Sequence, residues 1–321
     1  MEATLNHLAE YIRARDGFCV VAHTSPDGDT LGSSLALFLT LKKLGKRAVV
    51  VCDQPIPAIY RFLPEWDQVR LPSDAPQMEN VIAVDCADIG RLGAAGTLFE
   101  NARSTANIDH HSTNDSYAQI NALNTKAAAT GEIMFRLVGM LLTPLDRSIA
   151  LCLYTALTTD TGNFSYSNTT PDTFRIAAEL LEYGVDNAMI NRMIYRTIPL
   201  RKMKLMGYAV SNMELVHGGK IGVSVVRRNA MEKIGAADED TEGIIDHIRD
   251  VDTVEVAILF WETKDGDFKV SLRSKAAVDV SRIAARFQGG GHPRAAGLSA
   301  SGGFDEVYSA VVRAVIEAME G

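Results

Sequence analysis

The feature that most constrains the fold is a series of short apolar runs, each ending in an acidic or imidazole side chain. Four of them lie in the first third of the chain: FCVVAH (18–23), AVVVCD (48–53), NVIAVD (80–85) and TANIDH (105–110). Runs of this length are typical of strands buried on both faces, and the segment 30–45 between the first two has a helical pattern that closes on a glycine. The alternation predicts an α/β fold, a mostly parallel doubly wound sheet covered by helices.

The ends of these predicted strands carry the candidate functional residues. Ligands of such sheets bind beyond the carboxyl ends of the strands, and His23, Asp85 and Asp109 fall there. Two further helices are predicted over 127–142 and 146–160, the second capped by Asp146. Asp160 closes that helix, where the helix dipole disfavours an acid unless another partner holds it.

Two segments concentrate possible metal ligands. In HTSPDGDTLGSS the spacing places His23, Asp27 and Asp29 around one turn, although an Asp-rich turn that caps a helix is an alternative for this segment alone. In NIDHHSTND, Asp109, His110 and His111 follow a buried strand, where burial is costly unless the groups are paired or bound to metal.

Five carboxylates in one place predict a metal site. They would repel one another strongly without cations, and the set is Asp27, Asp29, Asp85, Asp109 and Asp160. Oxygen and imidazole ligands without a thiolate suit Mn²⁺ or Mg²⁺. Two such ions about 3.5–4 Å apart can stabilise both the attacking and the leaving oxygen of a displacement at phosphorus.

The second half of the chain predicts another α/β unit. Three helical patterns span about 171–213, and strand patterns follow at 220–228, 253–263 and 267–275, with helices near 241–249 and 304–320. We expect a catalytic domain over 1–190, a helical connection over 191–213 and a substrate domain over 214–321. The segment QGGGHPRAAG (288–297) predicts either a nest of backbone N–H groups for an anion, with Arg273 and Lys275 as nearby cations, or a flexible turn.

Composition limits the partners and the compartment. A net charge of −8 argues against a grip on long nucleic acid, but a small phosphorylated substrate remains compatible. The cysteines form no C-x2-C pair, and all but Cys52 fall in apolar runs typical of buried thiols, so neither a disulfide framework nor a zinc site is predicted. We find no signal-peptide pattern and no apolar run of about 18 residues, and therefore expect a cytoplasmic protein without membrane contact.

Five segments together resemble the DHH phosphoesterase family, and within it the nanoRNase and pAp phosphatase branch that carries a DHH-associated domain. They are HTSPDGDTLGS, VDCAD, NIDHHSTND, TDTGNF and GGGHPRAAG, in family order across nearly the whole chain. The resemblance implies one ion held by His23, Asp27 and Asp85, and another held by Asp29, Asp85, His110 and Asp160. It also implies that Asp109 orients the ligands and that His111 faces the scissile phosphate.

The resemblance further implies the substrate and the cofactors. Two divalent ions are expected, Mn²⁺ first and Mg²⁺ or Co²⁺ as alternatives. The substrates would be very short RNA, cleaved to nucleoside monophosphates, and 3′-phosphoadenosine 5′-phosphate (pAp), converted to AMP. Across an interdomain cleft the substrate contacts would be Arg273, Ser274, Gly289, Gly290, Gly291, His292 and Arg294. The sequence does not decide which metal is preferred or whether the protein forms a homodimer.

Three other functions compete with this one. A cyclic-dinucleotide or linear dinucleotide phosphodiesterase and a manganese pyrophosphatase share the catalytic segments, but the GGGH cluster disfavours the pyrophosphatase. A non-catalytic, metal-dependent nucleotide-binding module would bind without turnover. Phe164, Tyr166 and Tyr195 could stack a nucleobase, with a place in the core as the alternative.

Overall fold

The computed structural model describes residues 2–320, and this part of the chain divides into two compact units. The boundary falls after Thr197, within the stretch for which a helical connection was predicted. Each unit has its own six-stranded sheet and its own core. No helix within residues 2–320 is both long and apolar enough to span a membrane.

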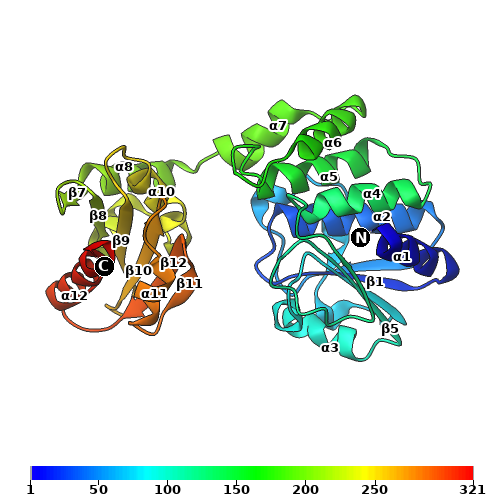
Figure 1. Cartoon of the computed structure of the whole chain (residues 1–321), viewed down its shortest axis with the longest axis horizontal. Helices are drawn as coiled ribbons and strands as arrows, with labels where there is room; N and C mark the ends of the chain where they lie inside the picture. Colours follow the sequence, from blue (N-terminus) through cyan, green and yellow to red (C-terminus); the bar gives the residue numbers. More distant parts are fainter. Residues whose placement is uncertain (1, 321) are drawn as a thin grey trace. The chain divides into compact units, whose positions relative to one another are not determined.

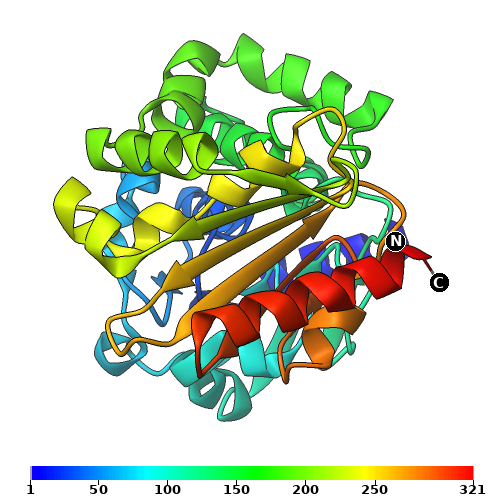
Figure 2. The ribbon, with the colours of Figure 1, turned by 90° about the vertical axis from the view of Figure 1, so that its left-hand side faces the viewer.

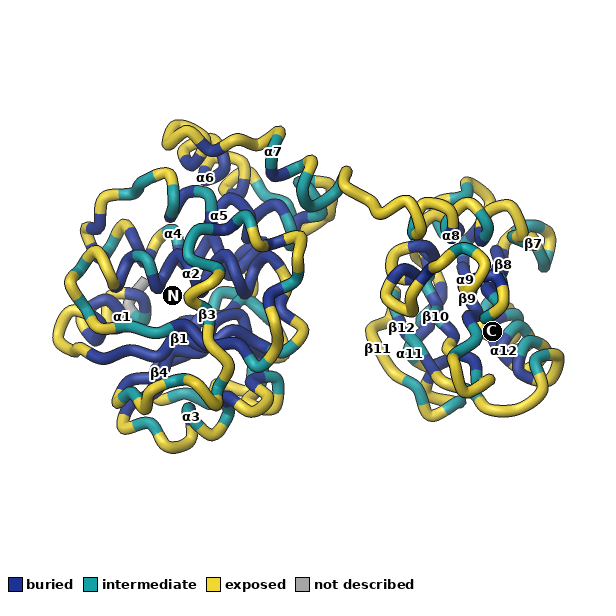
Figure 3. The backbone as a smooth tube through the Cα atoms, turned by 180° about the vertical axis from the view of Figure 1, so that it is seen from behind, coloured by how far each residue is buried: buried dark blue, intermediate teal, exposed yellow. Residues whose placement is uncertain are grey.

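The first unit is built on a wholly parallel sheet in the order β3-β2-β1-β4-β5-β6. Its strands are β1 (Phe18–Ala22), β2 (Ala48–Val51), β3 (Val69–Arg70), β4 (Asn80–Val84), β5 (Ser104–Asp109) and β6 (Ile120–Leu123). Every residue of β1, β4 and β5 is buried, as their continuous apolar runs predict (Figure 3). The short β3 and β6 at the two edges had no clear signal in the sequence.

Helices cover both faces of this sheet (Figure 1). One face carries the larger core, with α1 (Glu2–Ala14), α2 (Gly28–Lys43), α4 (Thr130–Met140), α5 (Arg147–Asp160) and α6 (Pro171–Glu182). The other face packs against α3 (Gly96–Glu100) and the 3-10 segment Ile89–Ala95. The unit ends with α7 (Asn187–Asn191) and a π-helical turn, Arg192–Arg196. The predicted doubly wound α/β fold is therefore confirmed.

The helix cap predicted at Asp146 is also confirmed, because its carboxylate accepts the backbone N–H of Ile149 at 2.9 Å. The cysteine prediction needs one correction. Cys52 is buried like Cys19, Cys86 and Cys152, because its thiol lies under the loop that follows β1 and contacts the carbonyl oxygen of His23 at 3.6 Å. All four thiols are free, as expected.

The second unit has a mixed sheet in the order β11-β12-β10-β9-β8-β7. The strands are β7 (Glu214–Val216), β8 (Ile221–Val226), β9 (Val256–Glu262), β10 (Phe268–Ser274), β11 (Gly290–His292) and β12 (Ala295–Ala300). One face packs against α11 (Val280–Ala285) and α12 (Phe304–Glu320), the red helix in Figure 2. The other face packs against α8 (Leu200–Ser211), α9 (Arg228–Ile234) and α10 (Ile244–Arg249).

Candidate metal centre

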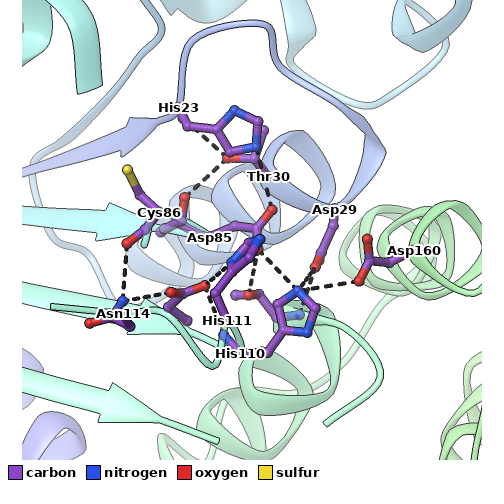
Figure 4. A network of polar contacts seen from close by, with 12 residues as sticks. His23, Asp29, Thr30, Asp85, Cys86, His110, His111, Asn114 and Asp160 are labelled. Carbon is purple, nitrogen blue, oxygen red and sulfur yellow. Dashed lines mark hydrogen bonds and ion pairs between the residues drawn. The ribbon is translucent and has the colours of Figure 1, made fainter. Parts of the chain in front are cut away.

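The predicted ligands of the first unit meet at the carboxyl edge of its sheet. β1 and β4 end one residue before His23 and Asp85, β5 ends at Asp109, and α5 ends at Asp160. The start of α2 contributes Asp27 and Asp29. Three sets of side chains place ligand atoms within 4.8 Å of one another: His23, Asp27 and Asp85; Asp29, His110 and Asp160; and Asp85, His110 and His111. Figure 4 shows how the side chains of His23, Asp29, Asp85, His110, His111 and Asp160 converge.

His23 presents a nitrogen that lacks a protein partner. Its Nδ1 lies 2.6 Å from the carbonyl oxygen of Thr24, so the ring proton resides on Nδ1 and Nε2 keeps its lone pair. Nε2 is buried without a hydrogen bond, 3.8 Å from Asp27 and 3.6 Å from Asp85. A buried acceptor facing two carboxylates is the arrangement that a cation satisfies.

Asp85 lies between two groups of ligands. Its Oδ2 faces Nε2 of His23 at 3.6 Å, whereas its Oδ1 faces Nε2 of His110 at 3.6 Å and Nδ1 of His111 at 3.8 Å. The residue adopts a left-handed backbone with φ 59°, which is unusual outside glycine and is typical of functional positions. Oδ1 also accepts the hydroxyl of Thr130 at 2.8 Å.

The helix starts of α2 and α4 hold the carboxylate of Asp29. This fully buried group accepts the backbone N–H groups of Thr130 at 2.6 Å and Gly131 at 3.0 Å, and the hydroxyl of Ser33 at 2.9 Å. Free N–H groups at a helix N-terminus favour a negative charge, so α4 stabilises Asp29 in its ionised form.

His110 bridges from β5 to the end of α5. Its Nε2 lies 3.2 Å from Asp160 and 3.9 Å from Asp29. On the other side of the ring, Nδ1 lies 3.3 Å from the carbonyl oxygen of Ala127, which can only accept and so directs the Nε2 lone pair toward the acids.

A hydrogen-bond network around Asn114 and Asp109 supports the metal centre. Asn114 lies within donor distance of Asp109 at 2.6 Å, Asn107 at 2.8 Å and the carbonyl oxygen of Cys86 at 3.2 Å, all through its Nδ2 (Figure 4). The second oxygen of Asp109 accepts the backbone N–H of His110 at 2.8 Å. Asp109 is thereby saturated by protein donors, which suits a supporting group better than a direct ligand.

The charges of the centre act on one another. Burial raises the pKa of Asp160 to about 6, and burial with the charges of Asp85 and Asp160 raises the pKa of Asp29 well above its usual range. Burial also acts on Asp85, but its contact with His23 and the charges of His110 and His111 outweigh it and lower the pKa. Excess negative charge in a buried volume is what divalent cations relieve, and the donor set fits such ions.

Sequence reasoning missed several residues that shape the centre. Thr130 and Gly131 hold Asp29 from the start of α4, and only the small-residue turn AAATG before a helix pointed to them. Arg91 was also missed: its Nη2 lies 3.4 Å from Nδ1 of His23, and its charge partly opposes the rise in the pKa of His111 that the contact with Asp109 causes. Among the side chains of residues 4–320, the Arg91 guanidinium forms no ion pair with a carboxylate, so its charge remains available to an anion.

The predicted substrate residues of the second unit lie around β10, β11 and β12. Arg273 and Gly289 border a hollow of about 680 Å³, also lined by Trp261, Lys269 and Ser271. Ser274 is buried, and its hydroxyl donates to the carbonyl oxygen of Val278 at 2.6 Å, which is a structural contact.

The glycine run forms a strand rather than the flexible turn that was one alternative. Gly290, Gly291 and His292 pair with Gly297, Ala296 and Ala295 of β12. A Cβ on Gly289 would overlap the carbonyl oxygen of Gly297, and one on Gly291 would overlap that of Ala295, so close backbone packing requires both glycines. The side chains of His292 and Arg294 are exposed at this edge of the sheet.

Fold and site together define a two-domain protein with an acid- and imidazole-rich centre at the carboxyl edge of a parallel sheet. The chain belongs to the DHH family: residues 17–157 match the DHH family N-terminal domain, and residues 218–321 match the DHHA1 domain.

Similar proteins cover the chain almost end to end. It is 35% identical to the bifunctional oligoribonuclease and PAP phosphatase NrnA of Thermus thermophilus, over 97% of this chain and 93% of that protein. It is 33% identical to a probable bifunctional oligoribonuclease and PAP phosphatase NrnA of Streptococcus mutans, over 90% and 91%. A crystal structure of an exopolyphosphatase-related protein from Bacteroides fragilis superimposes with a TM-score of 0.91 at 26% identity, covering 99% of this chain and 96% of that one.

Proposed function

We propose that this protein is a metal-dependent phosphoesterase that hydrolyses very short oligoribonucleotides to nucleoside monophosphates and pAp to AMP. The observation that carries the proposal is the position of Asp85, whose two oxygens face two different groups of ligands. The named activity of the relatives from Thermus thermophilus and Streptococcus mutans supports the choice of substrates.

Two divalent ions fit this centre, with Mn²⁺ as the expected one. His23, Asp27 and Asp85 would hold the first ion, and Asp29, Asp85, His110 and Asp160 the second. Such ions supply activation of water and stabilisation of charge on the oxygens at phosphorus.

The remaining groups act on the substrate and on its protons. His111, held by Asp109, is placed to transfer a proton or to stabilise charge at the phosphoryl group. Arg91, without a carboxylate partner in the described chain, would bind a phosphate oxygen. From the second unit, the exposed His292 and Arg294 and the half-buried Arg273 are the proposed contacts for a terminal phosphate or nucleotide.

The test compares wild type with Asp85→Asn and with Asp115→Asn. Asp115 is an exposed acid in the loop after β5, its backbone N–H bonds to the carbonyl oxygen of Ala87, and it belongs to no ligand group. Each protein is dialysed against Mn²⁺, assayed for bound metal, and given a labelled diribonucleotide, pAp and a cyclic dinucleotide. We expect Asp85→Asn to lose bound metal and to lower turnover by about 10³-fold or more, since even one preorganised stabilising group is worth ~10²–10³. Asp115→Asn should match wild type.

Other results would contradict the proposal. Tight binding of pAp without turnover by the metal-loaded wild type would indicate a nucleotide-binding module. Turnover of the cyclic dinucleotide alone would indicate a cyclic-dinucleotide phosphodiesterase. Full activity of Asp85→Asn would remove Asp85 from the centre.

A further inference from the structure

Three aromatic side chains gather beside the end of α5, and the structure separates their roles. Phe164 packs against the core and stacks on Phe174, with ring centroids 5.5 Å apart. Tyr195 donates its hydroxyl to the carbonyl oxygen of Thr158 at 2.6 Å, and burial raises its pKa to about 12. Tyr166 alone of the three stays largely open, with 62% of its surface exposed.

The backbone beneath Tyr166 is unusual. Gly162, Asn163 and Phe164 all adopt left-handed conformations, with φ of 53°, 57° and 63°. The backbone N–H groups of Ser165 and Tyr166 both bond to the carbonyl oxygen of Thr161 at 2.9 Å and close this turn. Non-glycine residues in this region are strained, and such strain concentrates at ligand-binding and active sites.

Gly162 provides a seat for the Tyr166 ring. A Cβ at Gly162 would overlap three carbon atoms of that ring, so the ring packs directly on the glycine backbone. The ring is therefore held in place by the main chain while much of its surface remains in contact with solvent. The Tyr166 ring is therefore fixed in position without being buried in the hydrophobic core.

The turn that holds the Tyr166 ring is connected to the metal centre through Asp160. Gly162 follows two residues after Asp160, and Asn168 ties the far end of the turn back by donating to the carbonyl oxygens of Asp160 and Ala128, both at 3.0 Å. The Tyr166 ring therefore belongs to the turn that follows Asp160 directly in the chain and is hydrogen-bonded back to its carbonyl oxygen.

We propose that Tyr166 is the stacking platform for the nucleobase of the nucleotide being cleaved. This inference rests on the proposed function, because only a nucleotide substrate brings a base next to the metal centre. An aromatic face binds any base through its π-system, which suits an enzyme that degrades short RNA without regard to sequence. Stacking would also make the enzyme prefer nucleotides to phosphate esters that carry no base.

The test uses the metal-loaded full chain with Tyr166→Ala, Tyr166→Phe and the control Tyr183→Ala, a tyrosine at the end of α6 that is 37% exposed. The substrates are a diribonucleotide, pAp and the abasic counterpart of pAp, a ribose 3′,5′-bisphosphate. We expect Tyr166→Ala to raise KM for both nucleotides about 10- to 100-fold, with kcat changed less than about threefold. Tyr166→Phe, which keeps the aromatic face, should restore most of the lost affinity, Tyr183→Ala should match wild type, and the abasic substrate should not distinguish the variants.

The outcomes separate this inference from the function on which it rests. If wild type turns over no nucleotide, the proposed function fails, and the platform fails with it. Two results with an active wild type would rule out the platform. In the first, Tyr166→Ala has the wild-type KM for the nucleotides. In the second, its KM for the abasic substrate rises as much as its KM for the nucleotides. If Tyr166→Ala unfolds more readily than wild type, the same KM comparison is made with Tyr166→Leu. Leucine keeps an apolar contact with Gly162 but offers no aromatic face.

Discussion

His111 holds its Nδ1 2.7 Å from Oδ1 of the fully buried Asp109. A carboxylate at this distance can only accept, so the ring proton lies on Nδ1 and Nε2 is left to act elsewhere. The same contact, the largest influence on this ring, raises the pKa of His111. Asp109 therefore both orients the imidazole and favours its protonated form.

Removing either partner should lower activity in different ways. We expect His111→Asn to lower kcat by about 10²–10⁴ and to leave bound Mn²⁺ unchanged. Asp109→Asn should lower kcat by about 10–100-fold. Asp109 raises the pKa of His111, so the Asp109→Asn variant should have a lower His111 pKa. As the pH rises, this variant should therefore lose activity at a lower pH than wild type. Steady-state pH profiles and metal analysis check both, and loss of metal in His111→Asn would make His111 a ligand instead.

Arg91 should contribute through its free charge. We expect Arg91→Gln to lower kcat/KM for the diribonucleotide about 10- to 100-fold, since a hydrogen bond to a charged group contributes ~1.5–3 kcal/mol. Arg91→Lys should recover part of this loss. Arg103→Gln, which removes an 82% exposed arginine at the start of β5, is the control. Equal activity of Arg91→Gln and wild type would show that Arg91 does not touch substrate.

Metal removal should change how stability depends on pH. The pKa of Asp160 is about 6 in the metal-free fold, above its ordinary value of 3.8, so the folded state binds more protons than the unfolded state between these values. The stability that this group contributes is present below about pH 4 and is lost as the pH rises to about 6.

Denaturant titrations of the chelated protein from pH 4 to 7 measure this dependence. Asp160→Asn should flatten it, and Mn²⁺ binding near pH 6 should release protons. A chelated wild-type protein whose Asp160 contribution grows with rising pH would contradict the expectation.

Close packing of α2 on α5 depends on Gly32. A Cβ there would overlap the carbonyl oxygen of Cys152, so we expect Gly32→Ala to lower the free energy of unfolding by about 1–3 kcal/mol. Gly139→Ala in α4 is the matched control. Apart from its chain neighbours and its own helix backbone, no described atom lies within 4 Å of its added Cβ, and it should stabilise by about 0.5–1 kcal/mol through helix propensity. Urea titrations measure both, and equal effects would show that α5 can move away from α2.

Much of the fold followed from local patterns. The apolar runs predicted β1, β2, β4 and β5 to within two residues, and the final helix 304–320 coincides with α12. The edge strands β3 and β6 were missed because two or four residues carry too little pattern. The glycine run was predicted to be an anion-binding nest or a flexible turn, and pairing with β12 shows that it is a strand, so the flexible turn was wrong.

The sequence by itself determined that acids and imidazoles meet at one edge of a parallel sheet. Parallel strands carry their carboxyl ends to the same side, so the residue that follows each run is placed without knowledge of distant contacts. Tertiary structure alone decided which oxygen of Asp85 faces His23 and which faces His110, and that Thr130 supports both Asp29 and Asp85. These contacts join segments far apart in the chain, and their geometry depends on how α2, α4 and α5 pack, which no local pattern encodes.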